Sequence, residues 1–306
     1  MTQSDSTHFP SHSAHDHAGI VDESLEDIAS ELVANGSIEL SVGDDQQIPK
    51  AAGLLPYGMS VFVPSPPKQD LMSNLEHIQA LHEAGFEPVP HIAARKIVSR
   101  MELENFLERA TGELGVHRVL LIGGDARKPN GPYKDGASIL RDGILVDYGI
   151  NEAILPGYPE GHPNISQEGL MADLEEKLGL AAGQGLCSEI ITQFCFAPSR
   201  IIEFCSILGR KFPETPVYVG VAGPTSTARL IRYANYCGVS ASLRALSTLG
   251  VKVANLLTHT DPSEQLDALA HYRATRQECN VLGIHVFSFG GFVESAQWMR
   301  EKCRKR

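Results

Sequence analysis

The sequence predicts one α/β domain, a single (β/α)8 TIM barrel, with a disordered N-terminal tail. From residue 37 onward, short β-branched or apolar runs alternate with longer amphipathic stretches. Such alternation is typical of right-handed βαβ units, which build a parallel sheet. The runs number eight, the strand count of a closed barrel. No Gly-x-Gly-x-x-Gly motif opens a helix after the first run, so a doubly wound dinucleotide-binding sheet lacks its main signature. An open α/β sheet is kept as the alternative.

The expected strands are rich in valine, isoleucine and leucine, residue types that favour a sheet buried on both faces. In chain order they cover 37–40, 59–63, 87–91, 118–122, 153–157, 188–192, 217–221 and 281–286.

The intervals between the strands carry helical periodicity. In the stretch after the second strand, Leu71, Leu75, Ile78 and Leu81 share one face at spacings of three and four residues. The first interval, 41–58, holds two prolines and three glycines and is predicted to be a loop. The expected helices cover 70–85, 98–115, 134–145, 166–183, 198–211, 225–237, 241–257, 263–278 and 292–303.

The domain organisation follows from these elements. A length of 306 residues favours two domains on length alone, at roughly 150 residues per domain, but one barrel accounts for the chain from residue 36 to residue 306. Residues 1–35 are rich in serine and histidine and are predicted to form a flexible, solvated tail. The histidines of this tail could also bind a transition metal, which is the less favoured alternative.

Charge and composition exclude several classes of protein. The formal net charge of −11 disfavours binding to nucleic acid or to an anionic membrane surface. No apolar run is long enough for a membrane span or a signal-peptide core, and the six cysteines show no zinc-type or Cys-x-x-Cys spacing. We therefore expect a cytoplasmic protein whose partners are small molecules; a homo-oligomer is left open.

Polar side chains gather where the expected strands end, at the edge that carries the active site of such barrels. Each has a structural explanation as well: an outward-facing position for Glu39, a hydrogen-bonded structural role for His91, a helix cap for Asp125 and an exposed strand end for Gln193. These strand-end residues are Glu39, His91, Asp125, Tyr158, Glu160, His162, Gln193 and His285. A metal site built from His91, Asp125, Glu160 and His162 is the less favoured alternative: these are ligand types, but their spacing matches no single-helix metal motif, so no metal site is predicted.

Taken in order, these segments resemble the methylenetetrahydrofolate reductase family, flavin-dependent (β/α)8 barrels of one-carbon metabolism. The resemblance covers roughly residues 35–290, and the motifs that carry it are SIELS, PHIAA, HRVLLIGGD, GYPEGHP, the ADL of MADLEEK, ITQFCF and GIHVFSF. It implies FAD as cofactor, NADH or NADPH as co-substrate, and interconversion of 5,10-methylenetetrahydrofolate and 5-methyltetrahydrofolate in methionine biosynthesis.

The resemblance also implies roles for single residues. Glu39 matches the general acid, Asp125 the aspartate beside the flavin and the folate, and Gln193 the glutamine that contacts the substrate. The positions that match flavin contacts are His91, Gly124, Asp125, Ala137, Tyr158, His162 and Asp173. Four positions depart from the family pattern, each where the family has a hydroxyl or a cation: Val63-Pro64-Ser65, Gly123, Leu180 and Gly291. Arg127 or Lys128 is expected to replace part of the missing charge.

The chemistry of the residues agrees with this reaction. Opening the folate imidazolidine ring requires a proton for the departing nitrogen, which a protonated carboxyl with a raised pKa can supply. Two alternatives are kept: a folate reductase that binds flavin weakly or not at all, and a non-catalytic folate-binding barrel that supports a demethylation system. Retention of Glu39, Asp125 and Gln193 together argues against the non-catalytic barrel.

Overall fold

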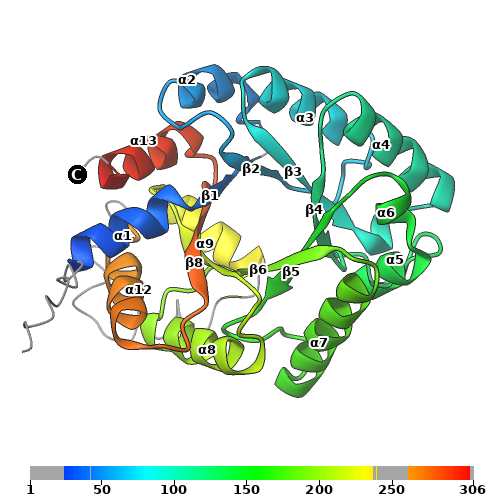
Figure 1. The fold of residues 1–306 in the computed structure, drawn as a ribbon. Coiled ribbons are helices and arrows are strands. Elements are labelled where there is room, and N and C mark those ends of the chain that lie inside the picture. Colours follow the sequence, from blue (N-terminus) through cyan, green and yellow to red (C-terminus); the bar gives the residue numbers. More distant parts are fainter. Residues whose placement is uncertain (1–23, 42, 237–238, 240–260, 304–306) are drawn as a thin grey trace, which may run out of the picture.

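The protein is a closed barrel of eight parallel strands surrounded by helices (Figure 1). A computed structural model describes residues 24–41, 43–236, 239 and 261–303. Each strand pairs with the next in the chain, and the last pairs with the first, Glu39 lying opposite Phe287. The (β/α)8 fold is confirmed, and the first and last residues of every expected strand lie within two residues of those observed. The strands are β1 Ser37–Glu39, β2 Ser60–Val63, β3 Glu87–Ala93, β4 Arg118–Ile122, β5 Glu152–Gly157, β6 Cys187–Thr192, β7 Val217–Ala222 and β8 Val281–Phe287.

The helices follow the expected pattern closely. The expected helix 134–145 is divided in two at Gly143, whose φ of 78° only glycine adopts readily. The expected helix 241–257 lies outside the described residues. The helical segments are η1 Asp45–Gln47, α2 Ile48–Ala52, α3 Asn74–Glu83, η2 Ala94–Lys96, α4 Arg100–Gly112, α5 Gly136–Asp142, α6 Ile144–Asp147, α7 Gln167–Gly183, α8 Pro198–Lys211, α9 Thr227–Tyr236, α12 Ser263–Thr275 and α13 Phe292–Cys303. No helix in the described ranges is long and apolar enough to cross a membrane.

Two expectations about the first part of the chain were wrong. Residues 25–34, assigned to the flexible tail, form helix α1 (Leu25–Ala34), which buries Ile28, Leu32 and Val33 and packs beside α12 and α13 (Figure 1). The Ser24 hydroxyl caps this helix by accepting from the Asp27 N–H. The interval 41–58, predicted to be a loop, contains η1 and α2, and its Pro49 stands in the first turn, where a proline is tolerated. The tail histidines lie outside the described residues.

The barrel interior is filled in layers. Its middle is an apolar layer formed by Phe62, Val89, Leu120, Ile154 and Ile191. The larger core lies between the sheet and the helices. Polar side chains are therefore separated into two groups, one at each end of the barrel.

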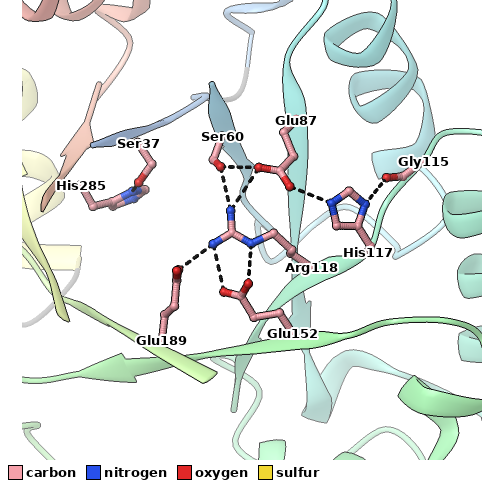
Figure 2. Close-up of polar contacts among 9 residues, drawn as sticks. All are labelled: Ser37, Ser60, Glu87, Gly115, His117, Arg118, Glu152, Glu189 and His285. Atoms are coloured by element: carbon pink, nitrogen blue, oxygen red, sulfur yellow. Dashed lines mark hydrogen bonds and ion pairs between the residues drawn. The ribbon is translucent and has the colours of Figure 1, made fainter. Parts of the chain in front are cut away.

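The group at the amino-terminal end is an ion cluster around Arg118, the first residue of β4 (Figure 2). Its guanidinium lies 3.1 Å from Glu87, 2.9 Å from Glu152 and 2.6 Å from Glu189, and it donates to the Ser60 hydroxyl at 2.8 Å. We call these five residues the base cluster. Ser60, Glu87 and Glu152 begin their own strands, so the cluster closes the end of the barrel opposite the usual active-site edge.

Candidate functional site

The carboxyl-terminal end of the barrel brings Glu39 together with two histidines. The Glu39 Oε2 atom lies 3.4 Å from His91 Nε2 and 3.9 Å from His285 Nε2. Glu39 ends β1, His91 lies in β3 and His285 in β8, and the Phe62 ring packs edge-on against both imidazoles. Glu39 therefore faces the barrel interior, and the outward-facing alternative for this residue was wrong. The sequence placed His285 at a strand end but assigned it no role.

Burial disfavours the charged form of all three of these groups, and it keeps the two imidazoles neutral near pH 7. It raises the pKa of the Glu39 carboxyl, and the neighbouring His91 opposes that rise only in part. It lowers the pKa of His91 to about 4 and that of His285 to about 3. Both Nε2 atoms are buried and make no hydrogen bond within the described part of the chain. The arrangement can hold a proton on Glu39 and release it when a base approaches.

The turn after β4 holds the residues that follow the motif HRVLLIGGD. Gly124 has a φ of +82°, and a Cβ there would lie 3.1 Å from that of Ala93, so this position favours glycine on both grounds. Arg95, on the turn after β3, donates through Nε to the Gly123 carbonyl at 3.1 Å. The next residue, Lys96, donates to the Ser65 hydroxyl at 2.9 Å and to the Pro66 carbonyl at 2.6 Å. Two cations that the sequence analysis did not single out therefore stand at this edge.

Residues from four segments of the chain meet around Tyr158. Its ring packs edge-on against His162 at 5.7 Å. Burial raises the Tyr158 pKa to about 12, Asp173 and Asp125 add to the rise, and Arg95 opposes it. Burial also lowers the pKa of His162, as does the charge of Arg95. We call Arg95, Asp125, Tyr158, His162 and Asp173 the mouth cluster; four of its five members are predicted site residues.

Two of the predicted flavin positions, Asp173 and Ala137, make contacts within the protein itself. Asp173 forms an ion pair with Lys177 one turn further along α7, and the Lys177 side chain is almost completely buried. This lysine stands one turn before Leu180, where the sequence lacks the family cation. Ala137, in the first turn of α5, is also buried. Its methyl group packs in the core, so its backbone is the part that a ligand could contact.

Gln193 follows β6 beside an aromatic group that the sequence analysis missed. Its side-chain oxygen accepts from the Phe194 N–H at 3.1 Å, which leaves the amide NH₂ to donate to a ligand. Phe289 has a left-handed φ of 47°, unusual for an aromatic residue, and it stacks on Tyr233 at 4.6 Å and on Phe287 at 5.8 Å. Because Phe287 is the register partner of Glu39, this aromatic group lies next to the buried acid.

Metal ligands do not gather among the described residues: no group of three or more His, Cys, Asp or Glu there could hold a metal ion. Of the cysteines in these ranges, Cys195 and Cys205 are buried as expected for small apolar side chains, whereas Cys187 is exposed.

Comparisons with known proteins give only weak likenesses. No family model matches the chain. Among solved structures, it is similar to 3-dehydroquinate dehydratase from Aquifex aeolicus VF5, with a TM-score of 0.40, 11% identity, and coverage of 66% of this chain and 84% of that chain. It is also similar to D-hydantoinase from Bacillus sp. AR9, with a TM-score of 0.36, 14% identity, and coverage of 61% and 45%. Likenesses this weak assign no activity, so any function must be argued from the site itself.

Proposed function

We propose that the protein is an oxidoreductase that interconverts 5,10-methylenetetrahydrofolate and 5-methyltetrahydrofolate with NADH or NADPH, using FAD and the general acid Glu39. The observation that carries the proposal is the buried Glu39 carboxyl at the carboxyl end of β1, whose pKa is raised by burial. Opening of the folate ring requires an acid that can donate a proton, and a raised pKa favours the protonated form of this carboxyl. The proposal makes the protein a cytoplasmic enzyme of one-carbon metabolism with small-molecule partners.

Glu39 supplies the proton in the reduction. Its carboxyl gives a proton to the folate nitrogen that departs from the methylene carbon, and that carbon receives a hydride that originates from the nicotinamide. The carbon–nitrogen bond breaks with its electron pair on the departing nitrogen, and the carboxylate regains a proton from solvent. In the reverse direction the same carboxylate accepts the proton. Since both neighbouring imidazoles are neutral, His91 and His285 do not compete as acids near pH 7.

Asp125 and Gln193 act on the substrate in this proposal. A carboxylate at Asp125, which is exposed in this structure, favours the cationic iminium form that precedes hydride transfer, and this field effect becomes stronger where a bound ligand excludes water. The Gln193 amide, held by the Phe194 N–H, donates to the edge of the pterin. The neighbouring Phe287 ring, which is only partly buried and stacks on the buried Phe289, offers an apolar surface to a planar heterocycle.

Two observations support FAD as the cofactor. The mouth cluster brings Tyr158, His162 and Asp173 into one neighbourhood, although they come from a loop and a separate helix. Arg95 stands beside Gly123, where the family has an arginine, so a guanidinium is still available to the phosphates. Gly124, Tyr158, His162 and Asp173, together with Arg95, would hold the flavin, which would supply the hydride-carrying ring between nicotinamide and folate.

The direct test is anaerobic oxidation of NADH or NADPH by the purified protein with methylenetetrahydrofolate, with and without added FAD. The proposal predicts a flavin absorption band, or its appearance on reconstitution, and formation of 5-methyltetrahydrofolate that depends on FAD. Turnover by a colourless protein that does not quench the fluorescence of added FAD would favour the flavin-independent reductase. Folate binding without any turnover would favour the non-catalytic barrel and contradict the proposal.

A further inference from the structure

A hydrogen-bonded pair lies directly beneath Glu39 in the barrel. The Ser37 hydroxyl and His285 Nδ1 are 2.8 Å apart, and both side chains are buried (Figure 2). The other ring nitrogen of His285, Nε2, lies 3.9 Å from Glu39 Oε2. Phe62 and Phe287 pack edge-on against the imidazole, each at 4.7 Å between ring centroids, which confines the ring to its plane. His285 thus connects Ser37 to the acid.

A cavity of about 30 Å³ lies on the other side of Ser37. Its polar wall includes Ser37, Ser60, Arg118, Glu189 and Tyr218, and a cavity of this volume has room for a water molecule. Arg118 donates to the Ser60 oxygen, and the Ser60 hydroxyl donates to Glu87 at 2.6 Å. The lining side chains with an oxygen that can accept from such a water include Asn35, Ser37, Glu189 and Tyr218.

A cavity water that donates to Ser37 would set the direction of the hydrogen bonds. If the Ser37 oxygen accepts from a cavity water, its own hydrogen points to His285 Nδ1, which must then be the unprotonated nitrogen. A neutral imidazole carries one proton, so Nε2 has it. A shift of about 1 Å would bring the Nε2–H to hydrogen-bond distance from Glu39 Oε2. An oxygen that accepts from an N–H is the carbonyl oxygen of a protonated carboxyl, and the acidic hydrogen then resides on the other oxygen.

We propose that Ser37 and His285 are positioning residues that hold the acidic proton of Glu39 on Oε1. A water in the 30 Å³ cavity beside Ser37 would be the last member of this series of hydrogen bonds. The inference rests on the proposed role of Glu39 as the general acid. It gives a function to two polar residues that the proposed reaction does not otherwise use. It also makes the interior of the barrel beneath Glu39, as well as its mouth, part of the catalytic apparatus.

The ionisable groups around Glu39 are few among the described residues. His91 faces it from β3 and His285 from β8, while β2 contributes the uncharged Phe62 ring. Beyond Ser37, the base cluster contributes Arg118 and its carboxylates, with Tyr218 beside Glu189. An N–H donor stabilises a carboxylate more than a carboxylic acid, so loss of the Nε2–H raises the pKa of Glu39 further.

The test compares Ser37→Ala with Ser188→Ala, a β6 serine whose buried hydroxyl makes no hydrogen bond within the described residues. Two readouts on the full chain are independent of folate turnover. Nitrogen-15 NMR of the histidine side chains, with the His285 signal assigned by its loss in His285→Asn, reports the tautomer. Infrared titration of the carboxyl band that disappears in Glu39→Gln reports the protonation of Glu39.

The proposal predicts the Nε2–H tautomer for His285 in the wild type and in Ser188→Ala. In Ser37→Ala it predicts a mixed or reversed tautomer and deprotonation of Glu39 at higher pH than in the wild type. An Nδ1–H tautomer in the wild type overturns the proposal, and this reading remains decisive should Ser37→Ala not fold. Equal Glu39 titration in Ser37→Ala and Ser188→Ala overturns it as well. Neither result bears on whether the protein reduces folate, so the two proposals fail separately.

Discussion

The Arg95 guanidinium fills the space beside Gly123. A Cβ built on Gly123 would lie 2.8 Å from Arg95 Nη2, and the same arginine donates through Nε to the Gly123 carbonyl. The absence of a side chain at Gly123 therefore makes room for the Arg95 guanidinium. From the sequence, Arg127 or Lys128 was expected to restore charge near this turn; the structure also brings Arg95 there, from the segment that follows the neighbouring strand β3.

Substitution of Gly123 by alanine tests this arrangement. The added methyl group displaces the flexible end of Arg95, so we expect little loss of stability but about tenfold weaker FAD binding, equivalent to ~1.4 kcal/mol. Quenching of FAD fluorescence measures the affinity. In an Arg95→Gln background the same Gly123→Ala change should have no further effect, because the group it displaces is absent. Independent, additive losses from the two substitutions would contradict the arrangement.

Arg95→Gln by itself should weaken binding of the anionic cofactor. We expect a loss of about tenfold or more in FAD affinity, since a charged hydrogen bond is worth roughly 1.5–3 kcal/mol. The matched control is Arg109→Gln on α4, whose exposed side chain pairs with Glu113 at 3.7 Å. FAD titrations at two salt concentrations should show weaker salt dependence for the Arg95 variant alone. If both variants bind FAD as tightly as the wild type, Arg95 has no role in the flavin site.

The base cluster should dominate the stability effects of charge removal. Arg118→Met leaves the largely buried Glu152 and Glu189 without their cation, so we expect a loss of about 3 kcal/mol in the free energy of unfolding. The control, Arg100→Met, removes an arginine whose partners Asp142 and Glu104 lie at the surface, where such pairs contribute about 0–1 kcal/mol. Urea denaturation measures both variants. A loss for Arg118→Met no larger than that of the control would show that the cluster contributes little.

The two buried histidines should make the protein sensitive to acid. Their folded pKa values, about 4 for His91 and about 3 for His285, lie below the ordinary value of 6.5. The unfolded chain therefore binds protons first, and the stability contributed by the neutral imidazoles is complete above pH 6.5 and is lost as pH falls toward 4. The raised pKa of Glu189, about 7, acts in the opposite direction, with stability lost as pH rises from 4.5 through 7.

The His285→Gln variant separates the effect of this histidine on stability from the opposing effect of Glu189. Below pH 6.5, His285→Gln should reduce the slope of unfolding free energy against pH by up to ~1.4 kcal/mol per pH unit. The exposed His82→Gln on α3 serves as the control and should leave that slope unchanged. The measurement is a set of urea titrations from pH 7.5 to pH 4. Equal slopes for wild type and His285→Gln would mean that His285 is not kept neutral by the fold.

The fold was accessible from the sequence because strands such as 118–122 and 217–221 are apolar runs with clear helical intervals between them. Helix α1 was missed because it follows a polar, histidine-rich segment, and its burial depends on contacts with α12 and α13 at the far end of the chain. In that case tertiary packing, not local composition, decided the structure.

The candidate site could be predicted from the sequence only in part. Strand ends identified Glu39 and His91, because the closed barrel brings the ends of parallel strands together. The hydrogen bond between Ser37 and His285 and the position of Arg95 beside Gly123 could not be predicted, since both contacts depend on the register between strands. The left-handed Phe289 was equally hidden, because its conformation is held by hydrogen bonds of Ser41 and Thr225 to the same turn.

The most direct test of the central claim is the turnover of Glu39→Gln, which keeps the shape of the side chain but cannot donate an acidic proton. Single-turnover reduction of methylenetetrahydrofolate should fall by about 10²–10⁴-fold, while folate affinity, measured by calorimetry, stays within a few-fold of the wild type. Glu108→Gln, at an exposed position on α4, is the control and should retain full activity. Undiminished turnover in Glu39→Gln would contradict the assignment of Glu39 as the acid and, with it, the proposed reaction at this site.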